Sequence, residues 1–268
     1  MSRGLGFDAP ADRPCVVGMV HLLALPGAPQ WGGSMQAVLD WAQRDAERLL
    51  EGGVDALLVE NMGDLPWLKG QVPPWTVAAA AIATERIVAL GKPTGVQLLA
   101  GANAEALGVA VATGARFVRV EAFAYGHLAD EGWLEACAGR LLRDRSALDA
   151  EVAVWADIRK KHAAHAVTAD VPLPELAHGT AFAGADTLIV SGVATGSPTS
   201  PSDLADAADA GVPVAVGSGV TPSLAQRLGA AHAWIVGSWL KEDGDWRRPV
   251  DAARVRRIVA EAHDARRR

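Results

Sequence analysis

Three carboxylates each end a run of mainly apolar residues in this sequence: Glu60, Glu121 and Asp157. A buried carboxylate is costly without a partner, so each position predicts either an ion pair or a bound ligand. Arg119 and Lys161 are available as partners for them. Such groups together could stabilise an oxocarbenium-like centre or move a proton beside a carbonyl, and a desolvated Lys161 could form a Schiff base.

Two further apolar runs end in small residues, at Gly217-Ser218-Gly219 and at Gly237-Ser238. Nothing larger than serine blocks the backbone N–H groups at such corners, so an anion can approach them. The alternative is a corner that needs glycine only for its turn. We expect a phosphate to be bound by Ser191, Gly192, Thr195, Gly217, Ser218, Gly219, Gly237 and Ser238.

Other polar residues close to the ends of apolar runs complete the predicted site. His21 and His162 join the candidate catalytic groups, although His21 could simply bond to a neighbouring backbone and Lys161 could be a solvated lysine. Contacts to the rest of the substrate are expected from Asn61, Asp64, Gln97, Asn103 and Arg119. His162 and His165 have metal-ligand spacing, but no H-E-x-x-H or cysteine set completes a site, so neither a metal nor another cofactor is predicted.

Eight Val-, Ile- and Leu-rich runs alternate with stretches of helical period, the pattern of parallel strands buried on both faces. The expected strands are 16–20, 55–60, 94–98, 116–121, 152–157, 187–191, 214–217 and 233–236. The expected helices are 34–51, 75–90, 103–113, 131–148, 172–182, 202–210, 222–228 and 250–264. Eight such units in series predict a single (β/α)8 TIM barrel, with an open doubly wound sheet as the alternative. The segment after Gly217 lacks the G-x-G-x-x-G spacing of that alternative.

Length and charge narrow the classes of protein. The 268 residues suit one barrel domain, residues 1–268, with a core from about 15 to 264. The net charge of −6 gives no basic field for nucleic acid. No apolar run reaches the roughly 18 residues of a membrane span, and the N-terminus lacks a signal pattern. The two cysteines, Cys15 and Cys137, match no metal or redox spacing. We therefore expect a soluble cytoplasmic protein, with no nucleic-acid partner and no membrane insertion, that could form a homo-oligomer.

Several motifs together resemble the BtpA/SgcQ family. They are Gly18-Met-Val-His21-Leu with Leu25-Pro26-Gly27, Glu60-Asn61-x-Gly63-Asp64-x-Pro66, Asp157-x-x-x-Lys161-His162-Ala163 and Val216-Gly217-Ser218-Gly219-Val220-Thr221. The resemblance runs from about Cys15 to about Val255 and implies a TIM barrel of the ribulose-phosphate-binding type. One branch of that family is named for photosystem I accumulation and another for sugar or nucleoside metabolism.

These observations favour an enzyme whose small-molecule substrate is a phosphorylated pentose or is nucleotide-like. The expected reaction makes or breaks a glycosidic C–N or C–C bond, with the phosphate bound after the sixth, seventh and eighth strands. A sugar-phosphate isomerase or an aldolase-like lyase would use the same groups. A barrel without catalysis, acting as an assembly or regulatory factor, is the third hypothesis, because a fold alone does not choose a function.

Overall fold

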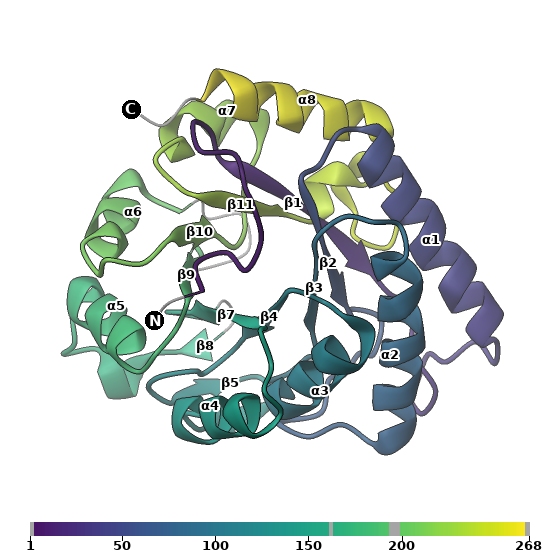
Figure 1. Ribbon diagram of the computed structural model, residues 1–268, viewed down its shortest axis with the longest axis horizontal. Helices are drawn as coiled ribbons and strands as arrows, with labels where there is room; N and C mark the ends of the chain where they lie inside the picture. Colours follow the sequence, from purple (N-terminus) through teal and green to yellow (C-terminus); the bar gives the residue numbers. More distant parts are fainter. Residues whose placement is uncertain (1–2, 161–162, 193–198, 266–268) are drawn as a thin grey trace.

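The computed structural model describes residues 3–160, 163–192 and 199–265. Eight parallel strands close into a barrel, in which the last strand pairs with the first (Figure 1). In order around the barrel they are β1 (Cys15–His21), β2 (Ala56–Glu60), β3 (Thr94–Gln97), β4 (Phe117–Val120), β7 (Ala153–Asp157), β9 (Thr187–Val190), β10 (Val214–Val216) and β11 (Ala233–Val236). The predicted (β/α)8 TIM barrel is confirmed, and the open sheet is excluded.

Helices surround the barrel in Figure 1 and lie in sequence between its strands. Local signals begin several of them: the Ser34 hydroxyl accepts from the N–H of Ala37, and Pro222 is the first residue of its helix. The α-helices are α1 (Met35–Glu51), α2 (Pro74–Val88), α3 (Asn103–Thr113), α4 (Ala138–Ala147), α5 (Leu173–Phe182), α6 (Pro201–Ala208), α7 (Pro222–Ala225) and α8 (Ala252–Asp264). Short 3-10 helices lie at Ala166–Thr168, Gln226–Leu228, Ser238–Leu240 and Glu242–Gly244. No helix among the described residues is long and apolar enough to cross a membrane.

Side chains alternate between two apolar layers because successive residues of a strand point to opposite faces of the sheet. Outward residues such as Val16 and Val118 pack against the helices. Inward residues, among them Leu58, Phe117 and Trp155, fill the barrel interior. A Cβ on Gly95 would lie 2.3 Å from the Phe117 ring, so glycine is needed at that position of β3.

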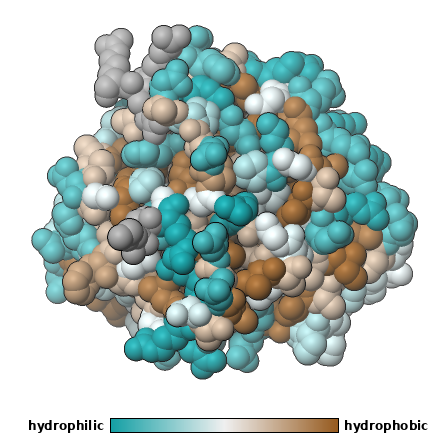
Figure 2. All heavy atoms as spheres, viewed as in Figure 1, coloured by the Kyte–Doolittle hydropathy of each residue, from teal (hydrophilic) through white to brown (hydrophobic). Residues whose placement is uncertain are grey.

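The N-terminal segment closes the end of the barrel at which the strands begin. It crosses the barrel in Figure 1, where it is drawn in purple. The Phe7 ring packs against Phe117 and stacks on Trp155, with centroids 5.8 Å and 6.3 Å away, and the Trp155 indole donates to the Leu5 carbonyl at 3.2 Å. On this face, hydrophilic side chains gather over the middle of the molecule (Figure 2). The N-terminal segment does not cover the other end of the barrel, where the strands finish.

The structure corrects one expected helix. Residues 131–148 do not form a single helix: an antiparallel hairpin comes first, β5 (His127–Ala129) and β6 (Gly132–Leu134), and α4 begins only at Ala138. Gly132 has a φ of +111°, which a helix cannot accommodate. A short strand after β7, β8 (Ala163–Ala164), pairs with β5. Because these segments follow the carboxyl ends of β4 and β7, the small sheet stands over that side of the barrel mouth.

Candidate functional site

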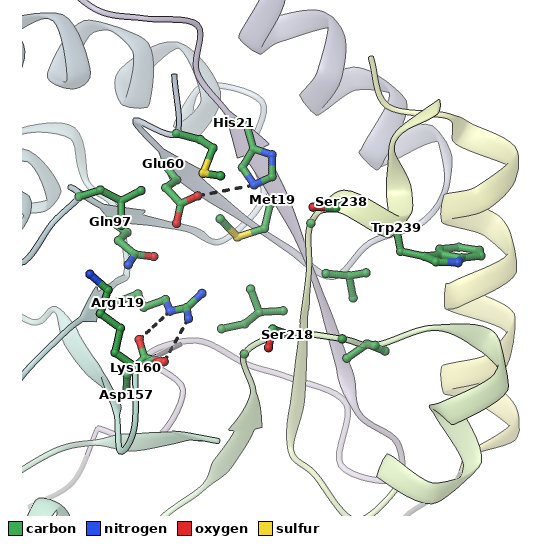
Figure 3. Close-up of a pocket in the computed structure, with 18 of the residues that line it drawn as sticks. Met19, His21, Glu60, Gln97, Arg119, Asp157, Lys160, Ser218, Ser238 and Trp239 are labelled. Carbon is green, nitrogen blue, oxygen red and sulfur yellow. Dashed lines mark hydrogen bonds and ion pairs between the residues drawn. The ribbon is translucent and has the colours of Figure 1, made fainter. Parts of the chain in front are cut away.

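A cavity of about 340 Å³ lies at the carboxyl ends of the barrel strands. Every second residue of a barrel strand points inward. This alternation places Leu58 and Phe117 inside the barrel, and further along the same two segments it places Glu60 and Glu121 in the lining of the cavity. The predicted site residues that line the cavity are His21, Glu60, Gln97, Arg119, Glu121, Asp157, Gly217, Ser218, Gly219, Gly237 and Ser238. In Figure 3 the two serines lie across the cavity from Arg119 and Asp157.

Arg119 and Asp157 form a two-pronged ion pair inside the barrel. The guanidinium donates from Nε to Oδ2 at 2.9 Å and from Nη2 to Oδ1 at 3.0 Å. The two side chains are only 11% and 3% exposed, so solvent screens the pair little. Burial alone would lower the pKa of Arg119, but Asp157 and the more distant Glu60 and Glu121 raise it. Arg119 therefore stays a cation that can face a negatively charged ligand.

Glu121 and Lys160 form the second charged group of the cavity. The Lys160 ammonium lies 3.4 Å from Glu121 Oε2 and 2.8 Å from Glu131 Oε2 in the hairpin turn. Burial raises the pKa of Glu121 to about 7, with Lys160 opposing that rise and Asp157 adding to it. The Gln97 amide donates weakly to Glu121 Oε1 at 3.4 Å. Near neutral pH this carboxyl can therefore either give or take a proton.

His21 and Glu60 stand at the ends of the neighbouring strands β1 and β2. The His21 Nε2 lies 3.6 Å from Glu60 Oε2, and both side chains are almost fully buried. A Cβ on Gly237 would lie 3.2 Å from the His21 ring, so the backbone just after β11 packs closely against this histidine. The imidazole thus lies between a carboxylate and one of the two Gly-Ser corners.

The Gly-Ser corners after β10 and β11 form the opposite side of the cavity (Figure 3). Gly217 has no room for a larger residue, since its Cβ would lie 2.5 Å from both Ile189 and the Ser191 hydroxyl. Gly219 has a φ of +75°, a left-handed conformation suited to glycine. A short 3-10 helix begins at Ser238. The Gly217 N–H donates to the Val190 carbonyl at 2.8 Å, so the N–H groups that such turns leave accessible to a ligand are those of the residues after it.

Several predicted site residues lie elsewhere, held by the fold. Asn61 accepts from the N–H of Leu99 at 2.7 Å and donates to Asp64 at 2.9 Å, while Asp64 accepts from the N–H of Leu25 at 2.7 Å. Asn103 donates to the Glu121 carbonyl at 2.8 Å. Asn61 and Asp64 thus connect the loops after β1, β2 and β3, and Asn103 binds the backbone at the end of β4.

Ser191 and Gly192, which were expected to contact the phosphate, are buried and are not among the residues that line the cavity. The Ser191 hydroxyl donates to Asp157 Oδ1 at 3.4 Å. Lys161, His162 and Thr195 lie outside the described residues. Within the described part of the chain, no group of three or more His, Cys, Asp or Glu side chains is arranged to hold a metal ion.

The cavity also contains residues that the sequence analysis did not single out. Lys160 contributes a cation where only Lys161 was expected, and Trp67, Trp239, Met19 and Met62 add apolar and aromatic surface. Trp67 Nε1 and Gln97 Oε1 are among the buried polar atoms at the cavity that have no hydrogen-bond partner among the described residues. Such atoms are costly unless a ligand or water meets them. Adjacent lysines at 160 and 161 gave no signal as to which one faces the barrel.

Solved structures share this fold at low sequence identity. N-(5′-phosphoribosyl)anthranilate isomerase from Pyrococcus furiosus is 14% identical, with a TM-score of 0.57 and coverage of 94% of this chain and 99% of that chain. KGPDC from Streptococcus mutans is 10% identical, with a TM-score of 0.59 and coverage of 94% and 99%. At such identities the likeness shows the TIM-barrel fold alone.

Proteins found by sequence similarity are more nearly identical to this chain than these solved structures are. An uncharacterised mitochondrial protein of Caenorhabditis elegans is 41% identical over 265 residues, covering 96% of each chain. The photosystem I biogenesis protein BtpA of Synechocystis is 38% identical over 249 residues, covering 91% of this chain and 86% of that protein. Residues 12–264 match the family model described as the BtpA family. The chain therefore belongs to the BtpA family.

Proposed function

We propose that this protein is an enzyme acting on a phosphorylated pentose or a nucleotide-like substrate, and that it makes or breaks a glycosidic bond at the sugar. The observation that carries the proposal is the division of one cavity into two sides. Carboxylates paired with Arg119 and Lys160 occupy one side, and two Gly-Ser corners occupy the other, with the Arg119 guanidinium reaching across to Gly217.

The Gly-Ser side supports a phosphate-binding role. After the seventh and eighth strands of a barrel, open backbone N–H groups and a following helical turn commonly bind phosphate. Gly217, Ser218, Gly219, Gly237 and Ser238 occupy those positions here. We assign the phosphate to the N–H groups of Ser218, Gly219, Gly237 and Ser238, with the two serine hydroxyls assisting, while Gly217, whose own N–H donates to Val190, keeps the corner free of a side chain. A phosphate fixed there would hold the sugar against the carboxylates.

The charged side supports chemistry at the anomeric carbon. When the bond from C1 to nitrogen or carbon breaks, its electron pair leaves with the aglycone, which takes up a proton, and positive charge develops at C1. Glu60 and Asp157 are placed to stabilise that charge. Glu121, with its pKa raised to about 7 chiefly by burial, is suited to supply the proton. Water then adds to C1, and its proton is returned to a carboxylate.

A second candidate is an assembly factor without catalysis, favoured by the name of the cyanobacterial relative. A scaffold has no need for three carboxylates and two buried cations around a cavity, since each buried charge costs stability. The enzyme is therefore the better supported proposal.

The test combines binding and turnover. Ribose 5-phosphate affinity is measured for the unmodified protein, for Gly219→Asp and for the matched control Gly219→Asn, which strains the same backbone without adding charge. We expect Gly219→Asp to weaken binding at least tenfold more than Gly219→Asn does, because its carboxylate repels the phosphate. Purine and pyrimidine nucleoside 5′-monophosphates are then incubated with the protein, and release of the base is followed by chromatography.

Asp157→Asn should leave phosphate affinity within a few-fold and lower turnover by orders of magnitude, as for a contact made mainly in the transition state. Equal affinities of Gly219→Asp and Gly219→Asn would contradict the phosphate site. Full turnover in Asp157→Asn would contradict the reaction.

A further inference from the structure

A second cavity adjoins the first on the side of β1. It has a volume of about 280 Å³, and His21 is the described residue that lines both cavities. Residues of the loop after β1, of the first turns of α1 and of the loop before α8 form its wall. Each cavity alone is near the lower end of the roughly 300–1,000 Å³ typical of ligand sites, whereas the two together lie well within it.

The wall of this second cavity is rich in indole rings. Trp31, Trp41 and Trp246 line it together with Arg247. The Trp41 Nε1 donates to the His21 carbonyl at 3.2 Å, which holds that ring in place. The Arg247 guanidinium lies 4.6 Å from the Trp246 ring centroid. A flat, electron-rich aromatic ligand fits such a wall, because it can stack on indole faces and on a guanidinium plane.

The junction between the cavities is polar and chemically suitable for the proposed reaction. The His21 ring meets the Trp246 ring edge-on, with centroids 6.4 Å apart, and its Nε2 lies 3.6 Å from Glu60 Oε2. A ligand spanning both cavities would place its mid-point beside His21. In a phosphorylated riboside, that mid-point is the glycosidic bond.

We propose that the second cavity binds the heteroaromatic ring of the substrate, so that the substrate class is a nucleoside 5′-monophosphate or a similar aromatic riboside phosphate. This inference rests on the proposed function for the position of the phosphate and sugar. The ring lies between Trp31 and Trp246, and His21 contacts the substrate where ring and sugar join. Gln30 and Ser34, at the same wall, can hydrogen-bond to the edge of the ring.

Calorimetric titration with three kinds of probe tests this proposal. Ribose 5-phosphate reports on the first cavity, the four common nucleosides on the second, and the corresponding 5′-monophosphates on both. Each is titrated into the unmodified protein, into Trp31→Ala and into Ala37→Trp, whose new side chain fills the second cavity from an exposed position on α1. The matched control is Trp133→Ala, a partly exposed tryptophan of β6 outside both described linings.

We expect at least one 5′-monophosphate to bind ten times more tightly than ribose 5-phosphate. Trp31→Ala and Ala37→Trp should each remove most of that advantage while ribose 5-phosphate affinity changes less than threefold, and Trp133→Ala should change neither. If no 5′-monophosphate gains over ribose 5-phosphate, or if the gain survives in both variants, the ring subsite is wrong although the phosphate site stands. If nucleosides bind and Ala37→Trp removes them while ribose 5-phosphate does not bind, the ring subsite is supported and the phosphate site fails.

Discussion

Burial and charged neighbours decide which role each carboxyl of the cavity can take. Glu121 is 5% exposed, and its nearest cation is shared with Glu131, so Lys160 offsets only part of the cost of ionising it. Asp157, in contrast, binds the Arg119 guanidinium directly through two hydrogen bonds. Two carboxyls of one cavity thus have different tasks: Asp157 holds the Arg119 guanidinium, and Glu121 suits proton transfer.

Stability should depend on pH through Glu121. Its pKa rises from 4.5 to about 7 on folding, mainly through burial, so the folded protein binds more protons than the unfolded chain between these values. Stability therefore falls as pH rises from about 4.5 to about 7, by on the order of 3 kcal/mol at most. Glu121→Gln, which cannot ionise, should lose this dependence.

Denaturant unfolding of both proteins at pH 5 and pH 8 measures this. Relative to the unmodified protein, Glu121→Gln should gain about 1–3 kcal/mol of unfolding free energy between the two pH values. Glu85→Gln, at an exposed glutamate of α2, is the control and should keep the pH dependence of the unmodified protein. A difference between Glu121→Gln and the unmodified protein that is the same at both pH values would contradict the raised pKa.

Much of the cavity follows from alternation along the strands, which the sequence displays directly. Once an apolar strand is placed, inward positions continue to the polar residue at its end, and this leads to Glu60, Gln97 and Asp157. No such alternation predicts where the side chain of a loop residue points. Asn61 and Asp64 accept hydrogen bonds from backbone N–H groups. The course of the loop after β7 places Lys160 in the cavity, and the sequence does not show which of the adjacent lysines 160 and 161 takes that position.

Elements with a strong apolar period were predicted within a few residues of their bounds, whereas the segment between β4 and β7 was not. Its hairpin is short, with Gly132 at the turn, and it pairs with β8 from a distant part of the chain. The sequence predicts a helix that begins at 131 because β5 and β6, at three residues each, are too short to show a strand period beside the helical period of 138–147. The hairpin is also the element that carries Glu131 to Lys160.

A buried ion pair joins the last βα unit to the first helix. Lys241, which is fully buried, pairs with Asp45 of α1, and Asp45 Oδ1 also accepts from the N–H of Val250 at 2.8 Å. Burial lowers the pKa of Lys241, and Asp45 opposes that effect. The pair anchors the segment that carries Trp246, and with it one wall of the second cavity.

Lys241→Met should destabilise the protein by about 3–5 kcal/mol, because it leaves the Asp45 carboxylate buried beside a single backbone donor. Adding Asp45→Asn removes the charge and keeps an oxygen for Val250, so the double variant should recover part of the loss. Lys92→Met, at an exposed lysine, should change stability by less than about 0.5 kcal/mol. Urea unfolding of the four proteins gives these values, and a double variant no more stable than Lys241→Met would contradict the charge argument.

At the scale of the whole molecule, the two ends of the barrel carry separate tasks. The end where strands begin is packed with aromatic rings and covered by the N-terminal segment. The end where strands finish holds the charged cavity. In barrels of this type, residues at the first end typically serve stability and those at the second serve function.

This division predicts that Phe7→Ala weakens folding and not binding. The variant uncovers Phe117 and Trp155, and because Phe7 is only partly buried, the loss should be about 2 kcal/mol, below the 3–5 of a fully buried phenylalanine. Phe182→Ala is the control, since its side chain is 95% exposed and should contribute little. Ribose 5-phosphate affinity of folded Phe7→Ala should equal that of the unmodified protein, whereas Gly219→Asp should lose affinity while matching the stability of Gly219→Asn, which strains the same backbone. Calorimetric unfolding and titration measure both quantities, and a parallel loss of affinity in Phe7→Ala would show that the packing beneath the barrel also sets the geometry of its mouth.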